Sequence, residues 1–197
     1  MPYSFQSQWE LFYPVKLPIS HYLIQDFPQF WFRIHSLPES KRYADTAAEY
    51  ELLLNRHNKI ITDCFGDDTS IFIVSGHYFS HSRNNKAYDP AFILPYQFHL
   101  EQEINLKLLN PEDYDDDEEN SFFRPYSIET IWQPKTHNEL LRKIADDELR
   151  AFMISFEKNI IVAPYDGGID FIILDEVKRN DLRNKYQDWL SPRADGL

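Results

Sequence analysis

The sequence predicts an α+β fold: a mixed or antiparallel sheet built from both halves of the chain, with about three helices packed mainly on one face. Two patterns predict this class. Short β-branched and aromatic runs bounded by turn residues recur along the chain, and three longer segments carry apolar residues at helical spacing. The composition agrees, because 43% of the 197 residues are hydrophobic and 16% are aromatic, which suits one folded domain over residues 1–197.

The first third of the chain predicts an arm followed by a strand, a helix and a strand. Residues 1–28 contain four prolines and many aromatics, so we expect an N-terminal arm without long regular structure that packs through its rings. Residues 30–35 alternate as a strand would. The next helix is capped by Asp45 or Thr46 and ends at Gly66. A β-branched run over residues 71–74 predicts a buried strand.

The remaining elements follow from the same signals. Residues 92–109 have apolar residues at even spacing, which favours strands over a helix. A short strand is expected over residues 127–133, and Thr136 and Glu139 fit a capping box at the start of a second helix. Three apolar runs joined by short turns then predict an antiparallel meander, and a last helix is expected before Pro192: the strands are 152–156, 160–163 and 169–174, and the helix is 176–190.

An acidic block at residues 111–120 is the strongest local signal in the sequence. It holds seven carboxylates, and without them the net charge of −12 would be −5. Such a block repels itself and predicts an exposed loop, which could attract a basic surface or could be a solvated loop without function. A calcium loop is disfavoured, because the central glycine and terminal glutamate are missing. The candidate partner-binding residues are Glu112, Asp113, Tyr114, Asp115, Asp116, Asp117, Glu118 and Glu119.

Three other groups of residues contain side chains that can take part in catalysis or metal binding. His77 and His81, with His99 on a neighbouring strand, lack the glutamate of a zinc-protease helix, so a polar sheet rim explains them better than a metal site. Cys64 lies among apolar positions, which indicates core packing. Asp166 and Asp170 could form a carboxylate pair for acid–base catalysis, although the glycines between them more plausibly supply positive-φ positions in a hairpin turn.

Composition also excludes several classes of protein. No apolar run is long enough to span a bilayer, and the N-terminus lacks the pattern of a secretory signal, so we expect a cytoplasmic protein without membrane contact. A single cysteine excludes an intramolecular disulfide and a multi-cysteine metal site. The acidity argues against direct nucleic-acid binding. No motif indicates a cofactor or a metal.

The C-terminal region resembles an uncharacterised bacterial family of unknown function. In that family a Tyr-Asp turn leads into a Gly-x-Asp strand and then into a helix that closes on Tyr-x-x-Trp-Leu. Residues 164–173 match the turn and strand, and Tyr186, Trp189 and Leu190 match the helix. Residues 30–79 are similar to its opening, whereas the acidic block has no counterpart. Gly167 stands where the family commonly has an arginine.

These observations lead to one expected function and two alternatives. We expect an immunity protein or antitoxin, not an enzyme, that binds a basic toxin domain through the acidic block. Small acidic bacterial proteins of this kind are often immunity proteins encoded beside toxins, and this expectation is an analogy. The first alternative is a small enzyme that uses Asp166 and Asp170, with His77 or His81. The second is an interaction module of a larger complex that involves no toxin.

Overall fold

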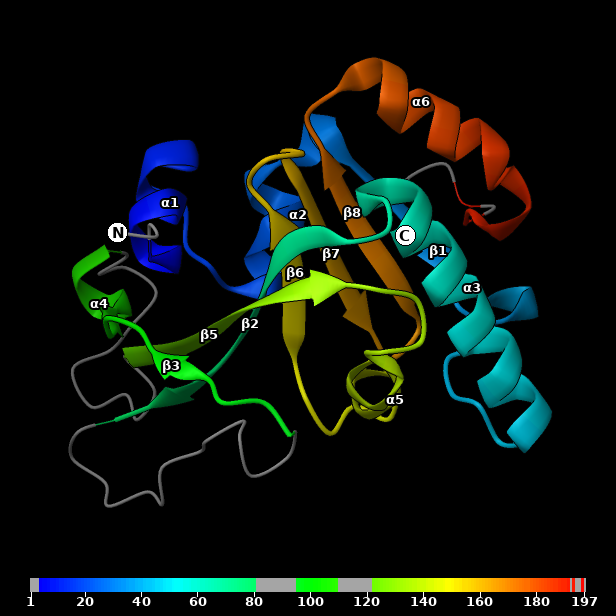
Figure 1. Cartoon of the computed structure of the whole chain (residues 1–197), viewed down its shortest axis with the longest axis horizontal. Helices are drawn as coiled ribbons and strands as arrows, with labels where there is room; N and C mark the ends of the chain where they lie inside the picture. The colour runs from blue at the N-terminus through cyan, green and yellow to red at the C-terminus, as the bar shows by residue number, and fades with distance from the viewer. Residues whose placement is uncertain (1–3, 81–94, 110–121, 192, 194–195, 197) are drawn as a thin grey trace.

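An eight-stranded antiparallel sheet organises the chain (Figure 1). The computed structural model describes residues 4–80, 95–109, 122–191, 193 and 196. The order of strands is β1-β8-β7-β6-β2-β5-β3, and β4 also pairs with β5. The strands are β1 (Trp31–His35), β2 (Thr69–Phe79), β3 (His99–Leu100), β4 (Ile104–Asn105), β5 (Phe122–Trp132), β6 (Ala151–Ser155), β7 (Ile160–Tyr165) and β8 (Gly168–Ile173). All pairs among them are antiparallel, which confirms the predicted class and selects the antiparallel form of the sheet.

The predicted meander is the centre of the sheet. Strands β6, β7 and β8 pair in sequence through two short turns, and nearly all of their residues are buried. Burial on both faces explains why these strands read as continuous apolar runs without alternation. Strand β1 then joins the far side of β8, so that the N-terminal part of the chain closes the sheet beside its C-terminal strand.

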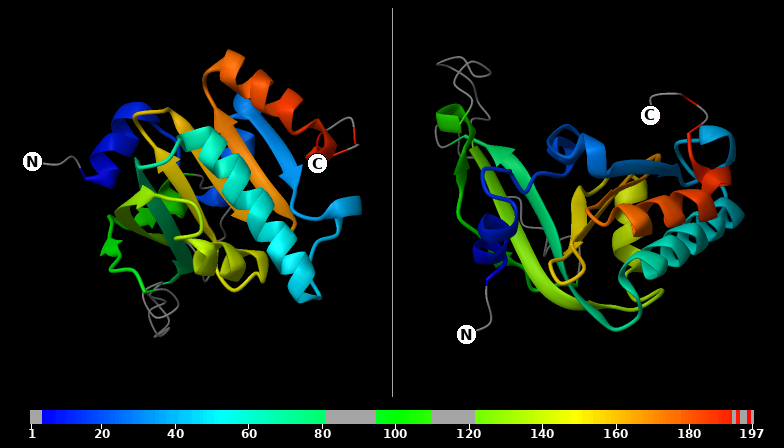
Figure 2. Two further views of the ribbon diagram at one scale, coloured as in Figure 1. Left: turned by 45° about the vertical axis from the view of Figure 1, so that its right-hand side comes forward. Right: turned by 90° about the horizontal axis from the view of Figure 1, so that it is seen from above.

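Six α-helices lie in the described residues, and α3, α5 and α6, which correspond to the three predicted helices, lie on the same face. Figure 2 shows α3 and α6 side by side over that face. The one-face arrangement is incomplete, however, because α1 and α2 from the predicted arm pack on the opposite face. The helices are α1 (Phe5–Phe12), α2 (Leu23–Asp26), α3 (Ala47–Phe65), α4 (Leu106–Leu109), α5 (Asn138–Ala145) and α6 (Glu176–Lys185).

Two hydrophobic cores result, one on each face of the sheet. The larger core joins α3, α5 and α6 to the residues of β1 and β8 that face them, including Ile34 and Phe171. The second core joins Phe5 and Trp9 of α1, with Phe27, to the residues of the sheet on the other side. The aromatic residues of the arm therefore cover a sheet face that would otherwise be exposed, which is the physical reason why the arm folds into short helices.

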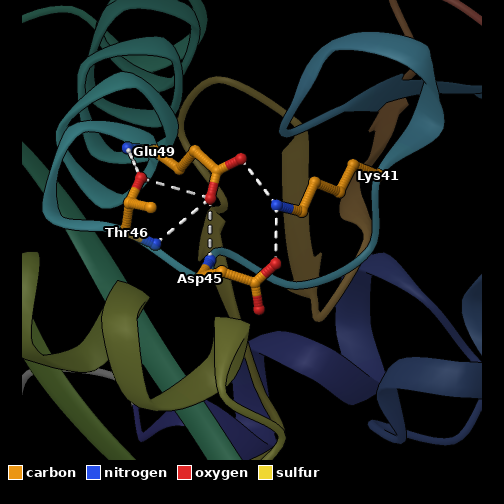
Figure 3. Close-up of polar contacts among 4 residues, drawn as sticks. All are labelled: Lys41, Asp45, Thr46 and Glu49. Carbon is orange, nitrogen blue, oxygen red and sulfur yellow. Dashed lines mark hydrogen bonds and ion pairs between the residues drawn. The ribbon is translucent and has the colours of Figure 1, made fainter.

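The start of α3 shows how the sequence fixes a helix end (Figure 3). Thr46 accepts a hydrogen bond from the backbone N–H of Glu49, and the Glu49 carboxylate accepts from the N–H groups of Asp45 and Thr46. Lys41 binds both carboxylates, at 2.6 Å from Glu49 and 2.7 Å from Asp45. The hydrogen bonds from Lys41 and from the Asp45 backbone lower the pKa of Glu49 to about 2. The predicted cap is confirmed, with Thr46 as the capping residue.

The capping box predicted for the second helix is wrong. Helix α5 begins after His137, and no side chain caps it. The backbone N–H of Thr136 bonds to Gln133 O, so Thr136 belongs to a turn that precedes the helix. The side chain of Asn58, from α3, accepts the N–H of Lys135 at 2.5 Å and holds this turn in place. A long-range contact thus replaces the local one that the sequence pattern suggested.

Candidate functional site

The turn between β7 and β8 holds the two carboxylates that the sequence singled out. Tyr165 pairs with Gly168 across the hairpin, which leaves Asp166 and Gly167 as the turn, and Asp170 follows in β8. Neither glycine has a positive φ, so the predicted reason for the glycines is wrong. The structure requires Gly168 because a Cβ there would lie 2.0 Å from Ile34 O of β1, and a Cβ on Gly167 would lie 2.9 Å from the Tyr165 ring.

Asp170 is the anchor of a buried ion pair between β8 and β1. It is the direct cross-strand partner of Arg33, whose Nε and Nη2 donate to its two oxygens at 2.7 and 2.9 Å. Trp31 Nε1 donates a third hydrogen bond at 2.9 Å. Burial by itself would lower the pKa of Arg33, but the hydrogen bonds and charge of Asp170 outweigh it and raise that pKa. The guanidinium also lies 4.5 Å from the centre of the Tyr165 ring.

Asp166 forms a second ion pair with a different part of the chain. Arg42 Nε donates to it at 2.5 Å and Tyr43 Oη at 2.7 Å, both from the segment between β1 and α3. The Asp166 side chain is buried, whereas that of Arg42 is mostly exposed. The hydrogen bond to Asp166 raises the pKa of both Arg42 and Tyr43. This pair ties the hairpin turn to the loop that leads into α3.

Both carboxylates face one cavity of about 230 Å³, so the structure brings together the two candidate residues. Ser20, His21 and Arg150 also line this cavity. The same three residues line a second cavity, of about 270 Å³, that reaches His77. His77 therefore does not belong to the carboxylate cavity, and His81 lies outside the described residues. Within the described ranges, no three His, Cys, Asp or Glu side chains are placed to hold a metal ion.

The bonding of the two carboxylates limits their chemistry. Asp170 accepts three hydrogen bonds and Asp166 accepts two, and in each case an arginine is a donor. A general base must be able to take a proton from a substrate, and hydrogen bonds already occupy both oxygens of Asp170 and Oδ2 of Asp166. The geometry favours a structural role for both residues, in holding β1 and the loop before α3 against the hairpin.

Sequence reasoning found the two aspartates but missed their arginine partners. In the predicted strand, Arg33 lies on the face opposite to that of Phe32 and Ile34. A charged residue inside a strand is a signal that a buried partner exists. Arg42 has no comparable signal, because its loop is irregular and it is exposed. The remaining candidate, Cys64, is buried in the larger core, and burial raises the pKa of its thiol.

The chain is thus an α+β protein in which the ion pairs of Asp166 and Asp170 hold strands and loops together. A family model described as a domain of unknown function, DUF3885, matches residues 19–194. The chain belongs to this family, and the matched range covers the β7–β8 hairpin and helix α6. No curated protein and no solved structure matches the chain.

The acidic block lies outside the described residues, and so do all eight predicted partner-binding residues, Glu112, Asp113, Tyr114, Asp115, Asp116, Asp117, Glu118 and Glu119. Their role stays a prediction. Across the part of the chain that the structure does describe, no helix is both long and apolar enough to cross a bilayer.

Proposed function

We propose that this protein is a cytoplasmic immunity protein or antitoxin that binds a basic toxin domain and blocks it. The observation that carries the proposal is the concentration of charge, because seven of the 32 carboxylates lie in residues 112–119. A dense negative segment accelerates encounter with a positive surface and favours the correct partner over others. The bonding of Asp166 and Asp170 supports binding over catalysis, since arginines occupy both carboxylates.

The first test asks whether the present protein binds the product of the neighbouring gene and protects cells against it. We expect this product to be toxic when expressed alone, to be harmless when expressed with the present protein, and to copurify with it. A neighbour that is neither toxic nor bound would reject the proposed function. A bound neighbour without toxicity would instead indicate an interaction module of a larger complex.

The second test separates the acidic block from the overall charge. Changing its seven carboxylates to amides gives a net charge of −5, and a control variant with seven other exposed carboxylates changed has the same net charge. We expect slower association and a weaker salt dependence for the block variant than for the control. Equal association rates would remove the block from the mechanism. The control positions are Glu39, Glu51, Asp67, Glu129, Glu157, Asp181 and Asp188.

An enzyme remains the second candidate, because Asp166 and Asp170 line one cavity together with His21 and Arg150. The two candidates differ in stoichiometry. A protein that blocks a toxin by binding protects only up to an equal molar amount of toxin, whereas an enzyme protects at far lower amounts. A titration of protein against toxin in a protection assay distinguishes them, and full protection well below equal amounts would favour the enzyme.

A further inference from the structure

A groove of about 540 Å³ separates α1 from the segment that contains β4 and α4. Gln6, Trp9 and Glu10 line the groove from α1, residues 101–105 line it from the segment around β4, and Leu108 and Leu109 line it from α4. Figure 1 shows α1 and α4 as neighbours at the edge of the molecule. The groove has the volume of a typical ligand-binding pocket.

Hydrogen bonds keep the two walls at a fixed separation. Gln6 Nε2 donates to Gln102 Oε1 at 2.8 Å, and the Gln102 backbone N–H donates to Gln6 Oε1 at 3.2 Å. Trp9 is buried beneath α1, and its Nε1 donates to Lys16 O at 2.7 Å. The groove is therefore preformed, so that an occupant would not have to order its walls.

The rim of the groove exposes large apolar side chains. Val15 is 99% exposed, Leu108 is 77% exposed and Leu109 is 53% exposed. Val15 also has a φ of +61°, in the left-handed region that β-branched residues rarely adopt. Such a strained residue normally persists because the surrounding structure or a function requires it. Among the described residues Val15 gains no burial in return, which points to burial against another molecule.

The groove carries more unpaired negative than unpaired positive side chains among the residues that the structure describes. Lys16 is paired with Asp26 at 2.7 Å, and Glu103 is paired with Arg124. Glu10 accepts a hydrogen bond from Gln6 and Glu101 accepts one from Ser127, but neither forms an ion pair with a residue that the structure describes. Two carboxylates next to exposed leucines complement a segment that is both apolar and basic.

We propose that this groove binds an amphipathic basic segment of a protein partner, with its apolar side chains on Leu108, Leu109 and Val15 and its lysines or arginines at Glu10 and Glu101. The proposal rests on the proposed function and deepens it, because it names the surface and the chemistry of the toxin segment. An amphipathic helix laid in an apolar groove is a common mode of peptide recognition.

The test uses three synthetic peptides of about 18 residues, or about five helical turns. The first is an amphipathic Leu/Lys helix, the second is its Leu/Glu twin, and the third is a scrambled Leu/Lys sequence without a continuous apolar face. Fluorescence anisotropy should show that only the first peptide binds the full-length protein tightly. Equal binding of the scrambled peptide, or no binding of the first, would overturn the proposal.

Variants of the exposed residues then place the peptide. Leu108→Ser/Leu109→Ser should weaken binding about tenfold or more, since the two side chains lose their apolar contact. Val177→Ser is the matched control, because Val177 is 71% exposed on α6 and lies outside the groove; its affinity should change less than about twofold. Unchanged affinity in the double variant would overturn the proposal. Circular dichroism checks that both variants are folded.

Two other occupants have their own outcomes. If deletion of residues 111–120 raises the peptide affinity about tenfold or more, the chain's own segment fills the groove, and the proposal is wrong. If the wild type sediments as a dimer and the double variant as a monomer, a second copy fills it, and the proposal is again wrong.

The same double variant separates this proposal from the proposed function. If it still binds and neutralises the neighbouring toxin with wild-type affinity, the groove proposal fails while the function stands. If the peptide binds the groove but the neighbouring product is neither toxic nor bound, the function fails while the groove stands as a site for basic amphipathic segments.

Discussion

The change Asp170→Asn tests whether the buried ion pair holds β1 to the sheet. The side chains of Arg33 and Asp170 are 15% and 10% exposed, so the pair is largely removed from water. Asparagine keeps an oxygen for Trp31 but leaves the Arg33 charge without its counter-charge. Removing one partner of a buried pair costs about 3–5 kcal/mol. Because Arg33 retains the Tyr165 ring at 4.5 Å, we expect a loss near the lower limit, about 3 kcal/mol.

The assay is urea unfolding followed by tryptophan fluorescence, with thermal unfolding in parallel. For a domain of this size the expected loss corresponds to a fall in Tm of about 6–12 °C. Asp181→Asn on the exposed surface of α6 is the control and should stay within about 0.5 kcal/mol of the wild type. The double change Arg33→Met/Asp170→Leu should recover part of the loss, because no unpaired charge remains. A stability of Asp170→Asn equal to that of the control would refute the reasoning.

Two further predictions concern glycine and histidine. Gly168→Ala should destabilise the protein by at least about 2 kcal/mol and reduce the hydrogen-exchange protection of β1, because the new Cβ meets Ile34 O; unchanged protection would contradict this. Burial lowers the pKa of His57 to about 3, below its value of about 6.5 in an unfolded chain, so its contribution to stability is complete above pH 6.5 and is lost as the pH falls toward 3. As the pH is lowered over that range, the free energy of unfolding should fall less steeply in His57→Gln than in the wild type, by up to about 1.4 kcal/mol per pH unit. Equal slopes for the two proteins would show that His57 does not titrate as described.

Much of the fold could be predicted because its signals are local. Thr46, Glu49 and Gly66 mark the ends of α3 within the helix sequence itself, and the three apolar runs of the meander are separated only by short turns. Such signals depend on neighbours in the chain, so one sequence is enough to read them. The arm was harder, since α1 and α2 are short and form where the second face of the sheet needs cover.

The candidate site was predictable only in part, because its contacts join distant segments. Asp170 and Arg33 are 137 positions apart, and Asp166 and Arg42 are 124 apart. The register between β1 and β8 decides these pairs, and no local pattern specifies a register over such a separation. For the same reason the sequence pattern predicts a turn conformation for Gly168, whereas its actual constraint is the close approach of the β1 backbone at Ile34 O.

The pairing of β1 with β8 has a consequence for synthesis of the protein. Residues 31–35 leave the ribosome well before residues 168–173, which form their partner strand. Until that strand is made, Phe32 and Ile34 have no place in the sheet and are exposed to solvent or to a chaperone. The pairing of β1 with β8 can therefore form only after residues 168–173 have been made. A premature stop before residue 168 would leave a chain that contains β2, β5, β6 and β7 but lacks β8, so that β1 would have no strand to pair with.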